Sequence, residues 1–316
     1  MTTLIKPSPV PTQATVQRLF HQSLAVLLLA AIVYQPYNVR VMIYSRLVDI
    51  ATRYTTNEYY THMWLFILNT TILHAAIYML ANGIVSICYY LQHPLIEQYK
   101  CNRSTWPWLT NKRQQYYKLI ENTLYNVAFT QFIITPCLSY LSFPRTNTRV
   151  KFHISDIPDT MTLLYQLLLC CMIEDTLFYF VHRLLHTKKL YWIHKVHHAH
   201  TQTVGIASEY SHWIEFIISS AIPFVAGPNI LHVHCYTYYI WLLLRIIKTT
   251  DAHCGYSFPF SPFSILPFQG TSAMHDAHHM NKAYGNFSSF FMYWDYICGT
   301  IIHIKDDIST NYQTSR

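Results

Sequence analysis

Histidine is concentrated in one part of this chain. Thirteen of its 19 histidines fall between His182 and His279. Eight of them form three tight clusters: His182 and His186; His194, His197 and His198; and His275, His278 and His279. Residues three or four positions apart share one face of a helix, so each cluster points two or three imidazoles to the same side. Such faces are typical of metal sites, because a bound ion takes about three or four such ligands.

The number of clustered histidines predicts two metal ions, because eight imidazoles exceed what a single ion binds. Imidazole nitrogen suits iron, zinc, copper and nickel, so the ligand type alone does not select the metal. The chain has no HExxH sequence, in which a glutamate between two zinc ligands acts as general base. Its absence argues against a zinc peptidase.

Two more histidines and two carboxylates are candidates for the same site. His212 and His253 lie between the second and third clusters, and ten histidines around two ions leave each about five-coordinate, with room for oxygen. Asp175 lies seven residues before His182, on nearly the same helix face. A carboxylate in a membrane span is a functional candidate, and one that accepts the free N–H of a ligating histidine is a common partner. Glu174 is the less well aligned neighbour, and a buried hydrogen bond to another helix is an equal alternative for Asp175.

The composition indicates an integral membrane protein. Hydrophobic residues make up 52% of the chain and charged residues 12%, against roughly 25% charged residues in an ordinary soluble domain. The net charge of +7 comes from basic residues spread through loops, which suits an anionic membrane surface and forms no stripe typical of nucleic-acid binding. The eight cysteines form no CxxC pair, which indicates packed, reduced thiols.

About 20 apolar residues are needed to cross a bilayer as a helix. The candidate spans are Leu19–Val39, His62–Leu91, Leu119–Phe143 and Pro158–Val181. Two shorter apolar stretches, Ile214–Ala226 and Ile230–Ile247, flank Gly227-Pro228 and predict a hairpin that dips into the membrane or packs on it. Lysine and arginine residues in the loop 92–118 and in the histidine-rich block favour the cytosol for both segments, and with them for both termini.

The predicted fold is an all-α integral membrane protein with about four transmembrane helices and a cytosolic helical, histidine-rich cap that holds a dimetal site. We predict a disordered tail over residues 1–18 and a C-terminal tail over residues 303–316. Transmembrane helices and a basic loop occupy residues 19–157. The histidine-bearing domain occupies residues 158–302.

Several segments of the second half resemble the fatty acid hydroxylase/sterol desaturase superfamily, and within it most of all the methylsterol monooxygenases. They are EDTLFYFVHRLLH, HKVHH, DAHCGYSFPFSPFSILPF and HDAHHMN with the following GNFSSFFMYWDYICGT, all within residues 158–302. The first 118 residues resemble the family only in being hydrophobic.

The resemblance implies an endoplasmic-reticulum membrane monooxygenase with a non-haem di-iron centre. Such an enzyme uses O2 and electrons from NAD(P)H, delivered through cytochrome b5 and its reductase. The implied reaction is oxidation of the C4-methyl group of a sterol in sterol biosynthesis. The implied iron ligands are the eight clustered histidines, and the family also tends to keep histidines where His212 and His253 stand.

Other functions stay open. The same site supports sterol side-chain hydroxylation, desaturation or fatty-acyl hydroxylation, and a catalytically silent membrane protein with a structural metal is an alternative of another class. Trp213 stands where methylsterol monooxygenases usually have proline, and it resembles the side-chain hydroxylases instead. Tyr210 is the candidate partner of a sterol 3-hydroxyl, with Trp213 nearby. The chain ends STNYQTSR, without a lysine-rich retrieval signal, so we expect another feature to retain it in the endoplasmic reticulum.

Overall fold

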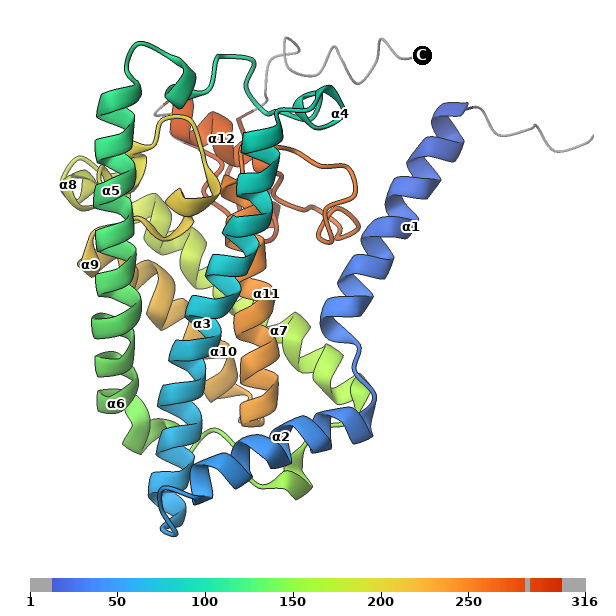
Figure 1. Cartoon of the computed structure of the whole chain (residues 1–316), viewed down its shortest axis with the longest axis vertical. Helices are drawn as coiled ribbons and strands as arrows, with labels where there is room; N and C mark the ends of the chain where they lie inside the picture. Colours follow the sequence, from blue (N-terminus) through green and yellow to red (C-terminus); the bar gives the residue numbers. More distant parts are fainter. Residues whose placement is uncertain (1–12, 282–284, 303–316) are drawn as a thin grey trace, which may run out of the picture.

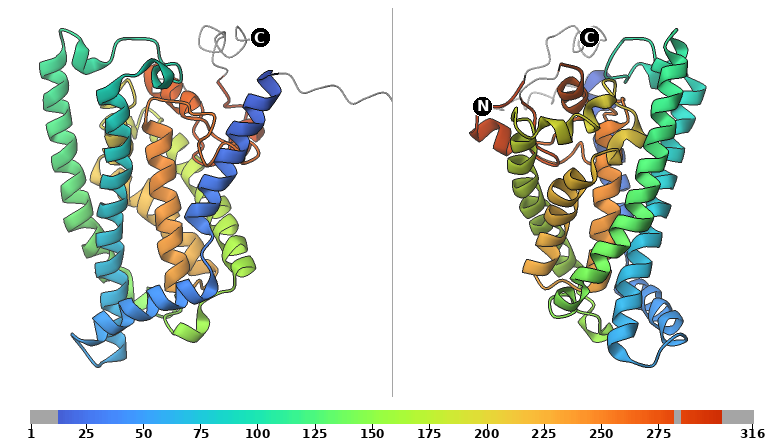
Figure 2. Two further views of the ribbon diagram at one scale, coloured as in Figure 1. Left: turned by 45° about the vertical axis from the view of Figure 1, so that its right-hand side comes forward. Right: turned by 90° about the vertical axis from the view of Figure 1, so that its left-hand side faces the viewer.

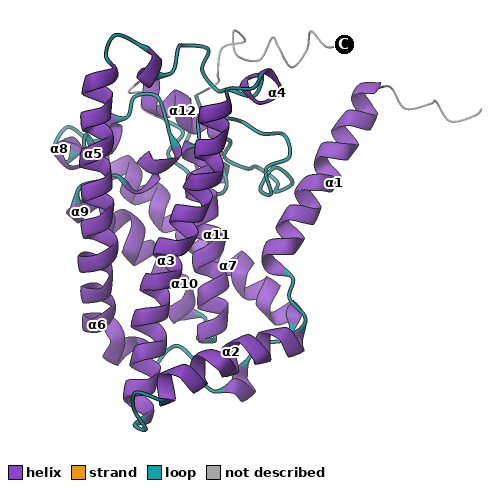
Figure 3. Cartoon of the chain, viewed as in Figure 1, coloured by secondary structure: helices purple, strands orange, loops and turns teal. Residues whose placement is uncertain are grey.

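The computed structural model describes residues 13–281 and 285–302, which are largely helical and contain no strand (Figures 1 and 3). The first half contains α1 (Gln13–Val33), α2 (Tyr37–Thr52), α3 (Glu58–Leu91), α4 (Pro94–Glu97), η1 (Pro107–Leu109), α5 (Arg113–Phe129), η2 (Thr130–Ile134), α6 (Thr135–Thr146) and η3 (Ile154–Asp156). The second half contains α7 (Thr160–Leu185), α8 (Tyr191–His194), η4 (His197–Ala199), η5 (Gly205–Glu209), α9 (Trp213–Glu215), η6 (Phe216–Ala221), α10 (Ile222–Ile230), α11 (Cys235–His253), α12 (Ser272–Asn281) and α13 (Tyr293–Ile297). The predicted all-α class is confirmed.

Four helical segments of the described chain are long and apolar enough to cross a membrane, in agreement with the predicted number. They are Glu58–Leu91, Arg113–Thr146, Thr160–Leu185 and Trp213–Ile230. The stretch predicted as the first span is instead divided between α1 and α2, which are bent by 43°. Pro36 precedes α2 and has no N–H to continue a helix, which explains the break.

The two predicted tails fall largely outside the described residues. α1 already begins at Gln13, so the last six residues of the predicted N-terminal tail are helical. Residues 1–12 and 303–316, which hold the remainder of the two tails, lie outside the described residues.

The apolar hairpin turns later than the Gly-Pro pair suggested. α10 continues through Gly227 and Pro228 to Ile230, and the chain reverses just before α11, where His232 has a positive φ of 50°. Gly227 is needed for packing, because a Cβ atom there would lie 2.9 Å from the Cα of Cys170. The absence of a side chain at Gly227 lets α10 approach α7 closely.

α11 forms the centre of the bundle, between α3 and α7 (Figure 2). Its buried residues include Trp241, whose indole N–H donates to the carbonyl of Phe224 at 3.0 Å. The second apolar stretch of the predicted hairpin is therefore a core helix. Its last residue is His253, the histidine that lies between the second and third clusters in the sequence.

The two ends of the bundle differ. One end, called the histidine end, carries α4, α8 and α12, while α2 lies across the opposite end (Figure 1). At the opposite end Tyr44 donates to the carbonyl of Phe152 at 2.8 Å, and Arg40 donates to that of Pro158 at 2.7 Å. α4 belongs to the basic loop 92–118, so this loop shares the histidine end as the topology prediction requires. The side of the membrane that this end faces stays a prediction.

Two π-helical segments, η2 and η6, interrupt long helices. Each is followed by a proline close to its end, Pro136 and Pro223. Proline lacks the N–H of an ordinary helical turn, and a wider turn accommodates the missing bond. η6 lines the cavity described below, and so does Thr135, which directly follows η2.

Candidate dimetal centre

Nine histidines meet at the histidine end in two groups that could each hold a metal ion. The five-histidine group consists of His182, His186, His194, His198 and His278. The four-histidine group consists of His197, His253, His275 and His279. In each group one nitrogen from every side chain lies within 4.8 Å of the others. α7, α8, η4, α11 and α12 supply these residues, so the site joins elements about a hundred residues apart.

The Nε2 atoms face inward in both groups. In the five-histidine group they approach at 3.1 Å for His182 and His194, 3.0 Å for His194 and His198, and 3.1 Å for His186 and His278. In the four-histidine group they approach at 3.2 Å for His197 and His253, 2.9 Å for His253 and His275, and 3.1 Å for His275 and His279.

The outward Nδ1 atoms bond mainly to backbone carbonyls. The acceptors are Phe287 for His182, Tyr210 for His197, Thr249 for His253, Gly285 for His278 and His200 for His279, at 2.7–3.1 Å. A carbonyl only accepts, so Nδ1 carries the proton of the neutral ring and Nε2 is left as a lone pair. Burial lowers the pKa of His197 and of His278 to about 4. Both rings are therefore neutral at pH 7.

Facing lone pairs repel each other unless a cation lies between them. His197 and His253 show this arrangement directly, because both donate Nδ1–H to a carbonyl while their Nε2 atoms are 3.2 Å apart. A shared metal ion turns this repulsion into coordination. The donor set therefore fits two ions of a metal that accepts imidazole, such as iron, zinc or copper.

Among the residues that the structure describes, Glu215 is the carboxylate that bonds to a histidine of the site. Its Oε1 accepts from Nδ1 of His194 at 2.7 Å, and both side chains are buried. A carboxylate in this position fixes the tautomer and raises the basicity of the inward nitrogen. Glu215 was not among the residues predicted from the sequence, although an ionisable residue within an apolar run was a usable signal.

Asp175, the carboxylate predicted for this role, contacts no histidine. Its Oδ1 accepts from the backbone N–H groups of Ser289, Phe290 and Phe291 at 3.0, 2.8 and 3.3 Å. It thereby holds the loop that presents the Phe287 carbonyl to His182. These hydrogen bonds are buried, as the alternative supposed, but they connect Asp175 to a loop and not to another helix.

Asp295, which the sequence analysis did not consider, holds the same loop. Its two oxygens accept from the N–H groups of Phe287 and Ser288 at 3.0 and 2.9 Å. Glu174, the other predicted carboxylate, pairs instead with Arg245, whose Nε donates to it at 2.7 Å.

His212 lies outside both groups. Its Nδ1 accepts the N–H of Ile214 at 3.2 Å and caps α9, and its ring packs between Trp192 and Trp213. Its position in the sequence between two clusters suggested ligation, but the start of a helix directs it elsewhere. His253, predicted on the same grounds, does join the four-histidine group.

The two residues predicted to bind substrate lie away from the space beside the histidines. The Tyr210 carbonyl accepts from His197, while its ring meets His200 edge to face at 5.5 Å. Trp213 is 51% exposed. Neither side chain lines the cavity described next.

A cavity of about 290 Å³ adjoins both histidine groups. His182 and His194 of the five-histidine group line it, together with three members of the four-histidine group, His197, His253 and His275. One wall is a stripe of α11 that runs from His253 back to Tyr238. At about 1.5 Å per helical residue, this stripe extends roughly 22 Å from the histidines. Ile222, which also lines the cavity, is 52% exposed and marks an opening on the side of a candidate span.

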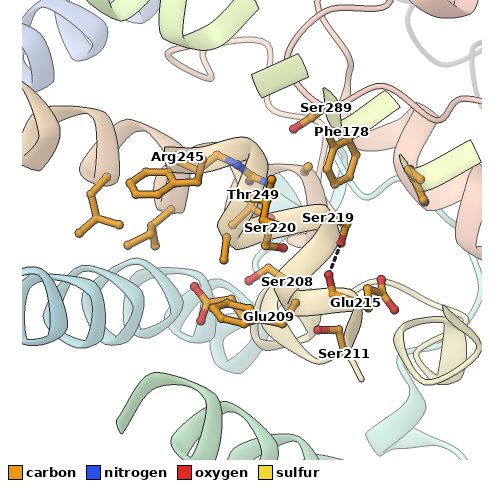
Figure 4. Close-up of a pocket in the computed structure, with 18 of the residues that line it drawn as sticks. Phe178, Ser208, Glu209, Ser211, Glu215, Ser219, Ser220, Arg245, Thr249 and Ser289 are labelled. Atoms are coloured by element: carbon orange, nitrogen blue, oxygen red, sulfur yellow. Dashed lines mark hydrogen bonds between the residues drawn. The ribbon is translucent and has the colours of Figure 1, made fainter. Parts of the chain in front are cut away.

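Many polar side chains line the cavity. Figure 4 shows among them Ser208, Ser211, Ser220, Arg245, Thr249 and Ser289. Farther along α11 the lining includes Tyr238 and Leu242, with Phe66 and Phe224 packed edge to face against Tyr238. A hydroxyl at this end, on Ser142, donates to the carbonyl of its own helix. The lining beside the histidines therefore carries the charged groups of the cavity, Arg245, Glu209 and Glu215, and is its more polar end. The deeper lining combines apolar side chains with the hydroxyls of Thr70, Thr135, Ser139 and Ser142.

Converging imidazoles that could hold two metal ions, at one end of helices long and apolar enough to cross a membrane, are typical of histidine-rich membrane oxygenases. The family model described as fatty acid hydroxylase matches residues 167–300. The chain belongs to the fatty acid hydroxylase superfamily, and the comparisons support an oxidoreductase of the oxygenase type.

The relatives of this chain include aldehyde decarbonylases and methylsterol monooxygenases. A very-long-chain aldehyde decarbonylase of Oryza sativa is 34% identical over 74% of this chain and 84% of that protein. A putative methylsterol monooxygenase of Dictyostelium discoideum is 32% identical over 77% of this chain and 86% of that protein. Methylsterol monooxygenase 1 of Gallus gallus is 34% identical over 66% of this chain and 67% of that protein. No solved structure matches the chain.

Proposed function

We propose that this protein is a non-haem di-iron monooxygenase that oxidises the C4-methyl group of a sterol. O2 is the oxidant, and the electrons come from NAD(P)H through cytochrome b5 and its reductase. We place the protein in the endoplasmic reticulum, with the histidine end facing the cytosol. The nine converging histidines are the proposed iron ligands.

The polarity of the cavity is the observation that carries this proposal. The histidines lie at its polar end, so an amphipathic lipid enters with its oxygen-bearing end toward the metals. In a sterol, C4 is bonded to the carbon that bears the 3-hydroxyl, so the C4-methyl group lies at that end. Side-chain hydroxylation requires the opposite orientation, with the apolar tail at the histidines, and the polar lining disfavours it.

The reaction converts a methyl group, O2, two electrons and two protons into a hydroxymethyl group and water. Two irons, when bound, supply the oxidising power that no side chain provides. The residues of this chain hold the metal ligands in place and orient the lipid. Glu215 fixes the tautomer of His194, Asp175 and Asp295 hold the loop whose carbonyls orient His182 and His278, and the stripe on α11 aligns the lipid.

The basic loop 92–118 supports the proposed electron donor and orientation. It contains Lys100, Arg103, Lys112, Arg113 and Lys118 and shares the histidine end with the metal site (Figure 1). A positive surface there suits an acidic haem protein, because complementary charge speeds encounter. Basic loops also favour the cytosolic side of a membrane.

Aldehyde decarbonylation is a second candidate, favoured by the relative from Oryza sativa. An aldehyde group would also lie at the polar end, followed by an acyl chain along α11. The two candidates differ in shape, since a rigid ring system needs width and a single chain does not.

Product analysis separates these functions. Membranes that contain the protein are incubated with a 4,4-dimethylsterol, O2, NAD(P)H and cytochrome b5, and the products are identified by mass spectrometry. The proposal predicts 4-hydroxymethyl and more oxidised products only when all components are present. Conversion of a very-long-chain aldehyde, with the sterol untouched, would establish the second candidate. Conversion of the sterol to a side-chain alcohol would refute the proposed orientation.

A further inference from the structure

The polar end of the cavity contains a single cationic side chain. Arg245 is the one lysine or arginine among the described residues that line the cavity. It lies on the α11 stripe between Leu242 and Thr249, and Figure 4 shows its guanidinium at the cavity wall beside Phe178. It was not among the residues predicted from the sequence, although it is, like Glu215, an ionisable residue within an apolar run.

Most of the hydrogen-bonding capacity of Arg245 is unused. Its Nε donates to Oε1 of Glu174 at 2.7 Å, and the Arg245 side chain is 13% exposed. Among the described residues its two terminal nitrogens have no hydrogen-bond partner. A guanidinium offers five N–H donors, and donors in a low-dielectric cavity are costly when they remain unpaired. Arg245 therefore points to an oxygen atom that the bound lipid brings.

Glu209, a carboxylate that also lines the cavity, has no such capacity. Glu209 accepts from Gln131 through Oε2 at 2.8 Å, and its Oε1 is 2.7 Å from Nε2 of His74. Both oxygens are thus engaged by protein groups. Arg245 is the better candidate for contact with a ligand.

The position of Arg245 fits an oxygen close to the reacting carbon. Its guanidinium carbon lies 5.8 Å from the centre of the Phe178 ring, and that ring lies 5.0 Å from the ring of His182. One aromatic ring therefore separates the guanidinium from the five-histidine group. An oxygen bound to Arg245 therefore brings the carbons next to it to the end of the cavity where the histidines lie.

The charge of the site favours a neutral oxygen group. Glu174 is fully buried and already compensates the positive charge of Arg245. A carboxylate ligand would add an uncompensated negative charge, whereas a hydroxyl only accepts the free N–H groups. The pair therefore suits an alcohol better than a free fatty acid.

We infer that Arg245 binds the hydroxyl oxygen of the substrate and thereby selects a 3-hydroxysterol over a lipid without this group. Glu174 acts through Arg245 as a positioning residue. This inference rests on the proposed function and names the side chain that binds the hydroxyl end of the sterol. It replaces Tyr210, the residue that the sequence suggested.

The test is direct binding to the full chain in lipid nanodiscs. The probes are 4,4-dimethylcholest-5-en-3β-ol and the matching hydrocarbon without the 3-hydroxyl. Binding of each probe is measured by the quenching of tryptophan fluorescence. A hydrogen bond to a charged group predicts that the wild-type chain prefers the alcohol by about tenfold or more. Arg245→Met should reduce this preference below about twofold, and Arg245→Lys should retain an intermediate value.

Two further variants guard against a trivial loss of folding. Arg40→Met removes a buried arginine at the opposite end, where Arg40 donates to Pro158 and Thr160, and should leave the preference unchanged. If Arg245→Met alone does not fold, the double variant Arg245→Met with Glu174→Gln removes both partners and avoids an unpaired buried charge. Loss of preference in the double variant supports the inference in the same way.

The outcomes separate the two proposals. A wild-type chain that prefers the alcohol while the Arg245 variants keep the same preference overturns the inference and leaves the proposed function standing. A wild-type chain that binds neither probe overturns both. The turnover of the same variants gives a second reading, since loss of a binding contact raises KM for the alcohol more than it lowers kcat.

Discussion

His234 at the opposite end and His197 at the histidine end are both buried, and both have one nitrogen against a backbone carbonyl. For His234, Nε2 donates to the carbonyl of His153 at 3.1 Å and Nδ1 accepts the N–H of Tyr236 at 3.0 Å. For His197, Nδ1 donates to the carbonyl of Tyr210, while Nε2 faces Nε2 of His253. One ring has two complementary partners, and the other has one partner and one opposed lone pair.

This difference shows that burial alone does not mark a metal ligand. A buried neutral histidine is satisfied when one nitrogen donates and the other accepts, as in His234. In the two groups at the histidine end, the inward nitrogens have only one another. A cation bound between the inward nitrogens would satisfy their lone pairs, and the proposed irons are such cations.

The contrast between the two ends predicts the largest loss of turnover and bound metal when a histidine of the four-histidine group is removed. His275→Ala leaves three imidazoles in the four-histidine group. Because loss of a residue behind a ligand already costs about 10–100-fold in metal affinity or activity, we expect loss of a ligand to lower turnover by more than about 100-fold. Bound metal, measured by mass spectrometry of the purified protein, should fall from about two ions per chain to about one.

His234→Asn is the matched control for that variant. Asparagine also caps helices, so α11 keeps its first turn. The variant should keep its metal content and its turnover. Equal metal loss in both variants would show that the geometric distinction has no meaning for metal binding.

Replacing the carboxylate behind the larger group should have the next largest effect. Glu215→Gln keeps an oxygen near Nδ1 of His194 but removes the charge that now lies 2.7 Å away. We expect metal affinity to fall about 10–100-fold, measured by titration with a chelator. The loss should concern about one of two ions, because the carboxylate contacts only the five-histidine group. A variant with an unchanged titration curve would rule out this support.

The sequence predicted part of this site through local spacing. Three clusters at helical spacing indicated shared faces, and nine of the ten predicted histidines do converge. Their ligation stays a prediction. His212 does not converge with the others, because proximity in the sequence does not fix the direction of a side chain. Its ring nitrogen caps the first turn of α9 instead. Apolar length predicted three of the four candidate spans, while Pro36 divides the stretch predicted as the first span. The remaining candidate, Trp213–Ile230, contains a stretch that was predicted as one arm of a hairpin.

The supporting residues were harder to find because their partners are distant in sequence. Glu215 is 21 residues from His194, and Arg245 is 71 residues from Glu174. Asp175 was correctly identified as a buried carboxylate, but its backbone partners lie more than a hundred residues away. Such pairs depend on how α7, α11 and the loop after α12 pack, which no local pattern encodes.

The loop behind the five-histidine group allows a finer test of its support. Asp295 is fully buried and also accepts from the hydroxyl of Thr300 at 2.7 Å. Asp295→Asn replaces a charged acceptor, and we expect unfolding to become easier by about 2 kcal/mol. Chemical denaturation in detergent measures this value. Asp159→Asn at the exposed start of α7 is the control. Aspartate and asparagine cap the start of a helix about equally well, so a change of only a few tenths of a kcal/mol is expected.

The smallest expected effect concerns His234 itself and depends on pH. Burial, the main cause, lowers the pKa of His234 to about 4, below the value of about 6.5 in an unfolded chain. Around it lie the ring of Tyr44 from α2 and the side chains of Lys151, His153 and Asp156.

Because the folded pKa of His234 is the lower one, the unfolded chain binds more protons as the pH falls through 6.5 toward 4, and stability decreases. Between pH 7.5 and 5.5 the contribution of His234 should decrease by about 1 kcal/mol. Other histidines titrate as well, so the quantity to compare is the pH-dependent change in wild type minus that in His234→Asn. This difference, followed by thermal unfolding in detergent with metal bound, isolates the ring that is satisfied without a metal. A difference of zero would mean that His234 is not held neutral, and the contrast with His197 would then rest on geometry at the histidine end alone.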